Sequence, residues 1–166
     1  RLAIINGKVA FFAPDTGITP LSRCPPQIRM RSTPLPLLRH TPASFARAND
    51  CFEQAMALDP LYAEPHANLG SSYLFSAMLG LRSLREAMPL IRAEANEALT
   101  LAPSDPGPHF LLASVAAAYE YDWQRAAEHF ALALAGASVS PDAHWAYASL
   151  YLQPLGRFDE AVAHME

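Results

Sequence analysis

A sequence pattern typical of the end of a helix occurs three times along this chain of 166 residues, and it constrains the fold more than any other feature. It reads CFEQAMALDP at 51–60, ANEALTLAP at 95–103 and HFALALAGAS at 129–138. Apolar and small residues recur in each copy at offsets of three, four and seven, which places them on one helical face. Small residues on that face let a neighbouring helix approach closely. The repetition therefore predicts a stack of similar helices.

A second stretch with helical periodicity follows each ending, at 63–80, 108–123 and 141–156. Gly80 and Gly156 close two of these stretches, as expected for a left-handed C-terminal cap. The unit is therefore helix, turn, helix, about 34 residues long. The first unit is longer, with its excess in LRSLREAMP (81–89). Either Pro89 lies in the first turn of the next helix, or Ser83 begins that helix and Pro89 kinks it.

The first 40 residues do not share this pattern. Asn6-Gly7 lies between two apolar runs, which predicts a β-hairpin with a type I′ turn. The stretch from 25 to 42 contains five prolines, too many for a helix. We therefore predict two parts, a proline-rich arm with a possible hairpin at 1–40 and a helical repeat domain at 41–166.

The repeat domain resembles the tetratricopeptide repeat (TPR) family. The resemblance covers about 41–166, and the matching residues are Leu69, Gly70 and Tyr73 in a first helix, Ala48, Phe52, Ala55 and Pro60 in a second helix, and the turn LGRFDEA at 155–161. It implies an all-α, right-handed superhelical solenoid. A narrower likeness, to TPR tails behind bacterial kinase, cyclase or winged-helix regulator domains, is based on 41–60 and 121–134.

In TPR proteins the first helices line a concave face that binds a peptide. The residues that the resemblance places there are Glu64, Ala67, Ser71, Leu74, Phe110, Ser114, Ala117, Ala143, Ala146, Leu150 and Gln153. The set is small, apolar and nearly uncharged. Ala67 and Ser71 stand where a clamp for a C-terminal carboxylate needs Lys and Asn, so an amphipathic helix or the protein's own arm fits better. The alternative is that these residues are simply packed between helices.

Three histidines, His66, His109 and His144, recur at one place in the successive first helices. Adjacent helices lie about 8–10 Å apart, whereas zinc needs its nitrogen ligands at about 2.0–2.1 Å. We expect no metal site, and expect the histidines to cap or fill the repeat interfaces. No nucleophile motif and no glycine-rich phosphate loop occurs, so we expect neither an enzyme nor a cofactor.

Charge divides the chain unevenly. Residues 1–47 carry a net charge of +6 and residues 48–166 a net charge of −10. A basic arm can contact nucleic acid or a membrane, but we favour an arm that lies on its own acidic body. We expect no nucleic-acid partner and, without an apolar run of about 18 residues, no membrane span. Cys24 and Cys51 form no disulfide framework, so we expect reduced thiols and a cytoplasmic protein.

These observations predict a protein–protein interaction module that belongs to a larger regulatory protein. One alternative is structural self-association, through the arm or through the last helix with its apolar Phe158, Ala161 and Met165. A third hypothesis is that the chain is the regulatory piece of an enzyme whose catalytic domain lies elsewhere.

Overall fold

The structure of this protein is a computed structural model that describes residues 2–5, 8–11, 41–135 and 139–165. The chain divides into two compact units, residues 1–33 and residues 34–166. Each unit is considered by itself below.

The described part of the first unit is a pair of strands, β1 (Leu2–Ile5) and β2 (Lys8–Phe11). They run antiparallel, with Leu2 opposite Phe11 and Ile5 opposite Lys8. This register leaves two residues between the strands, as a tight hairpin requires. The predicted type I′ turn at Asn6-Gly7 and the proline-rich stretch lie outside the described residues.

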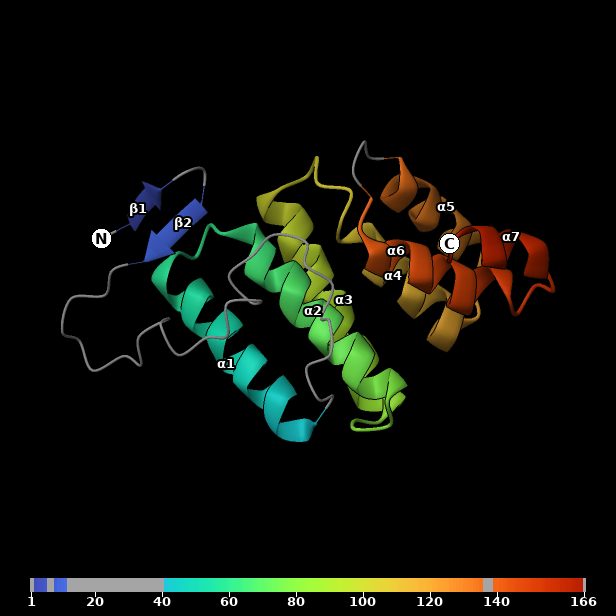
Figure 1. Cartoon of the computed structure of the whole chain (residues 1–166), viewed down its shortest axis with the longest axis horizontal. Coiled ribbons are helices and arrows are strands. Elements are labelled where there is room, and N and C mark those ends of the chain that lie inside the picture. The colour runs from blue at the N-terminus through green and yellow to red at the C-terminus, as the bar shows by residue number, and fades with distance from the viewer. Residues whose placement is uncertain (1, 6–7, 12–40, 136–138, 166) are drawn as a thin grey trace. The chain divides into compact units, whose positions relative to one another are not determined.

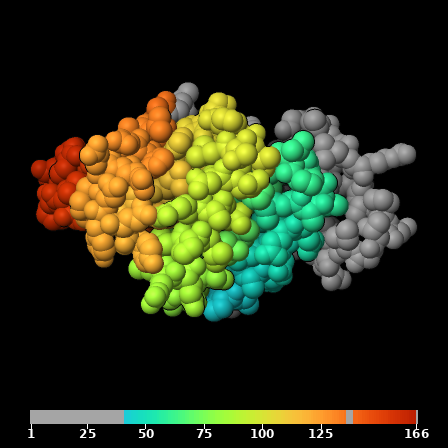
Figure 2. Space-filling model, turned by 180° about the vertical axis from the view of Figure 1, so that it is seen from behind, coloured from blue at the N-terminus to red at the C-terminus, as the bar shows by residue number. Residues whose placement is uncertain are grey.

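The described part of the second unit is all helical, which confirms the predicted fold class (Figure 1). Its elements are α1 (Pro42–Leu58), α2 (Ala63–Met78), α3 (Leu84–Leu101), α4 (His109–Val115) with the π-helical turn η3 (Ala116–Glu120), α5 (Trp123–Leu134), α6 (Pro141–Ala146) with the π-helical turn η4 (Tyr147–Leu152), and α7 (Phe158–Ala163). Helix α1 is followed by three hairpins, each made of a first helix (α2, α4 or α6) and a second helix (α3, α5 or α7). Figure 2 shows the hairpins as successive layers.

Local sequence explains where the helices begin. At the start of α1 the Thr41 hydroxyl accepts a hydrogen bond from the Ser44 N–H at 3.2 Å, and the Ser44 hydroxyl oxygen accepts one from the Thr41 N–H at 3.1 Å. This reciprocal pair is a capping box. At α3 the Ser83 hydroxyl accepts from the Glu86 N–H, and Pro89 lies inside the helix. The structure therefore agrees with the alternative in which Ser83 begins the helix.

The first helices end in a left-handed residue. Gly80 and Gly156 have φ angles of 71° and 75°, which confirms both predicted caps. Tyr121 occupies the same place in the middle hairpin with a φ of 56°. A non-glycine residue is strained there, because its Cβ crowds the backbone.

The core contains the small residues of the repeated endings. Ala55, Ala98 and Ala133 are buried, as the helical-face pattern predicts. Gly70 lies close to α4, because a Cβ at this position would lie 2.8 Å from the Leu111 Cδ1 atom, which would have to shift. Cys51 is also buried, and Cys24 lies outside the described residues.

Candidate interaction surface

The residues predicted to line the binding face fall into two groups. Glu64, Ala67, Ser71, Leu150 and Gln153 remain at least partly accessible. The others are buried in the helical core: Leu74, Phe110, Ser114, Ala117, Ala143 and Ala146. A partner cannot contact these six in the structure as it stands. For them the alternative interpretation, packing between helices, describes their position.

The burial follows from the small residues of the middle hairpin. Ser114 and Ala117 have small side chains and belong to the first helix of that hairpin. The flanking first helices α2 and α6 both contact α4. The rings of Phe75 in α2 and Trp145 in α6 lie 5.5 Å apart, and Trp145 packs against the core cluster that contains Phe110. The Ser114 hydroxyl donates to the Phe110 carbonyl at 2.7 Å, so it offers no free donor.

Sequence reasoning missed Phe75 and Trp145. The signal that could have found Trp145 is the spacing of the histidines, since His144 follows His109 by 35 residues. The same offset pairs Phe110 with Trp145.

The accessible members form what we call the first-helix face: Glu64, Ala67, Ser71, Phe75, Trp145, Leu150 and Gln153. Two of its polar groups are engaged locally. The Glu64 carboxylate accepts a hydrogen bond from the Tyr62 hydroxyl at 2.8 Å, and the Ser71 hydroxyl donates to the Ala67 carbonyl at 3.0 Å. The face therefore offers mainly apolar and aromatic contacts.

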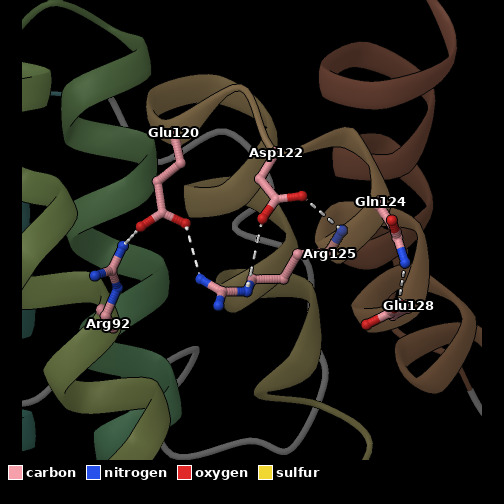
Figure 3. Close-up of polar contacts among 6 residues, drawn as sticks. All are labelled: Arg92, Glu120, Asp122, Gln124, Arg125 and Glu128. Atoms are coloured by element: carbon pink, nitrogen blue, oxygen red, sulfur yellow. Dashed lines mark hydrogen bonds and ion pairs between the residues drawn. The ribbon is translucent and has the colours of Figure 1, made fainter.

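An ion-pair network ties the first two hairpins together (Figure 3). Glu120, at the end of η3, bonds Arg92 of α3, and its other oxygen lies 3.5 Å from Arg125 of α5. Asp122 caps α5 by accepting from the Arg125 N–H at 3.0 Å, and its second oxygen lies 3.9 Å from the guanidinium. These side chains are partly exposed, so the network sets the orientation of the hairpins more than their stability.

The three histidines of the first helices each bond a residue of the paired second helix. The Nδ1 atom of His66 lies 2.7 Å from Glu94, that of His109 lies 3.1 Å from the Nδ1 atom of His129, and that of His144 lies 2.9 Å from the Nδ1 atom of His164. Each of these contacts lies inside one hairpin, between its first and second helix, and not between successive repeats. Within the described residues no group of three or more His, Cys, Asp or Glu side chains gathers to hold a metal ion.

Burial shifts the titration of several of these side chains. It is the main cause of the lowered pKa of His109 and of His129, since a neutral imidazole is favoured away from water. Burial also raises the pKa of Tyr73, with smaller contributions from Glu94 and Glu53. The Arg82 guanidinium lies 5.0 Å from the centre of the Tyr73 ring and opposes that rise.

A solved structure shares this arrangement of helices. The chain is similar to TTC0263, a thermophilic TPR protein in Thermus thermophilus, with a TM-score of 0.57 and 22% sequence identity over 74% of this chain and 62% of that one. This chain has a TPR-like fold. A second solved structure, MamA MSR-1 C2, has a TM-score of 0.41 and 20% identity over 74% of this chain and 64% of that one.

The TPR-like chain spans less than two thirds of the length of either neighbour. No protein-family model matches its sequence, and no curated protein matches it. In the part of the chain that the structure describes, no helix combines the length and the apolar character needed to cross a bilayer.

Proposed function

We propose that this chain is a protein–protein interaction module that binds an amphipathic helical segment of a partner through the first-helix face. The observation that carries the proposal is the contact between Phe75 and Trp145, two partly exposed rings from different hairpins. Aromatic side chains commonly supply the dominant contacts of an interface. Because few charges surround these rings, the complementary segment is apolar on the side that faces them.

The proposed context is a larger cytoplasmic regulatory protein in which this array recruits a partner and carries out no chemistry itself. The resemblance to TPR tails of bacterial regulators supports this context. The carboxylates of Glu120 and Glu94 are engaged by arginine or histidine, which suits a structural role better than acid–base catalysis. The proposal includes no nucleic-acid partner, because the repeat domain is acidic.

The experiment is a pull-down from a library of amphipathic helical peptides, compared among three arginine variants. Ala67→Arg and Gln153→Arg introduce a charge on the first-helix face, whereas Ala131→Arg makes the same kind of change on an exposed part of α5. We expect the first two to lose at least tenfold in affinity and the third to bind like the wild type. Thermal melts show that each variant is folded. Equal binding by all three would place the partner elsewhere.

A second candidate function is self-association through α7. Phe158, Val162 and Met165 are exposed there by 64%, 57% and 53%. If chains associate through this apolar face, light scattering will show a dimer that Phe158→Glu dissociates. Leu132→Glu, on an exposed part of α5, is the matched control and leaves the dimer intact. A wild-type chain that stays monomeric at high concentration rules this candidate out.

A further inference from the structure

The three histidine contacts form a regular series. In each hairpin the Nδ1 atom of a first-helix histidine bonds a side chain of the second helix, and we call these contacts the histidine rungs. The partner is Glu94 in the first rung, His129 in the second and His164 in the third. Glu94, His129 and His164 are spaced by 35 residues, so they occupy one position of the repeat.

The two kinds of rung respond oppositely to a proton. A bond between two Nδ1 atoms needs an N–H on one ring and a lone pair on the other, so it exists only while at least one ring is neutral. Once both rings are protonated, two N–H groups and two positive charges face each other at about 3 Å. A bond from imidazole to carboxylate strengthens on protonation, because it becomes an ion pair.

We propose that the second histidine rung makes the repeat array sensitive to pH, so that acidification loosens the second hairpin relative to the first. The rings of the second rung are stacked with centres 5.3 Å apart, and those of the third lie 5.2 Å apart. The two rings of each pair are therefore in contact between the first and the second helix of one hairpin.

The charges around the second rung support this direction. Burial lowers the pKa of both histidines, and for His129 the neighbouring His109 and Arg125 lower it further. The carboxylate of Asp105 raises the pKa of His109, and that of Glu128 raises the pKa of His129, but both effects are smaller than that of burial. The closed hairpin thus keeps its imidazoles neutral at a pH at which exposed ones, with a pKa of about 6.5, already bind protons.

The sign follows from linkage. Opening exposes imidazoles that take up protons below pH 6.5, so the equilibrium constant for opening rises as the pH falls, by up to about tenfold per pH unit for each proton bound. At the third rung the rings of Tyr147 and His164 meet edge to face, with their centres 4.9 Å apart. The Glu160 carboxylate of α7 interacts electrostatically with His164. Glu160 is held by Arg157, so it is not a free counterion for the third rung.

The test is amide hydrogen exchange on the full chain at pH 7.5 and pH 5.5, corrected for intrinsic exchange rates, in buffer with a chelator. We expect opening of α4 and α5 to increase at least fivefold at the lower pH relative to α2 and α3. The matched variants exchange the two kinds of rung. His129→Glu removes the acid-induced opening of the second hairpin, and Glu94→His transfers it to the first.

Two results overturn the proposal: a ratio of exchange rates that is the same at both pH values, or a His129→Glu variant that keeps the wild-type response. Nitrogen NMR of the wild-type imidazoles gives an answer that does not depend on variants. At neutral pH each His–His pair shows one ring protonated at Nδ1 and the other at Nε2. Pairs in which both rings are protonated only at Nε2 contradict the rungs.

Discussion

Helices α5 and α7 share a repeated sequence pattern with an offset of 35 residues, yet equivalent apolar residues of the two copies differ in burial. Phe130 in α5 is fully buried, with its ring centre 5.1 Å from that of Tyr147 and 5.7 Å from that of Tyr151. Met165, at the equivalent position after α7, is 53% exposed. The pattern therefore specifies a face that can be buried. Whether the face becomes core depends on a first helix packing against it, as η4 does against α5.

The largest expected effect on stability comes from removing the buried ring of α5. Phe130→Ala removes a fully buried ring that packs against Tyr147 and Tyr151, so we expect the free energy of unfolding to fall by about 3–5 kcal/mol. Met165→Ala should change it by less than about 0.5 kcal/mol, because the side chain is half exposed. Urea denaturation measures both. Similar losses in the two variants would mean that the face of α7 is covered in solution.

The same contrast explains what the sequence could and could not predict. The helices, the stacked hairpins and the glycine caps follow from local signals, such as the spacing of Ala55, Ala98 and Ala133. The burial of Ser114 does not, because it depends on helices on either side of α4. The sequence aligned His66, His109 and His144 but did not reveal their partners, since a histidine opposite His109 can be recognised only after the second helices are aligned.

An intermediate effect on stability is expected at the ends of the first helices, where one hairpin has a tyrosine and another a glycine. Tyr121 and Gly156 occupy equivalent left-handed positions, before α5 and α7 respectively. Tyr121 is 71% exposed and gains little from packing, whereas the strain of its backbone costs about 1–2 kcal/mol. We expect Tyr121→Gly to raise the free energy of unfolding by up to about 1 kcal/mol, although glycine adds entropy to the unfolded chain.

Gly156→Ala is the reciprocal change. Nothing lies within 4 Å of the Cβ that it adds, so only backbone strain acts, and we expect a loss of about 1 kcal/mol. The two variants measured in one denaturation series should shift in opposite directions. A loss in both would show that Tyr121 makes a contact that outweighs its strain.

The smallest expected effect depends on pH and concerns the starts of α4 and α6. Asp142 stands in the first turn of α6, whereas the residue 35 positions earlier is the uncharged Gly107, which precedes α4. Burial raises the pKa of the Asp142 carboxyl above its usual value of 3.8. The folded chain therefore holds this proton to a higher pH than the unfolded chain does, and the contribution of Asp142 to stability falls as the pH rises through that interval.

Asp142→Asn removes the ionisation, so we expect the variant to gain stability relative to the wild type as the pH is raised from 3 to 7. Asp159→Asn is the control, because this exposed carboxylate at the start of α7 favours its helix and its loss should not stabilise the chain. Thermal melts across this pH range measure both differences. A difference between Asp142→Asn and the wild type that stays constant with pH would mean that the carboxyl is well solvated when folded, and that α6 starts as α4 does, without a charge penalty.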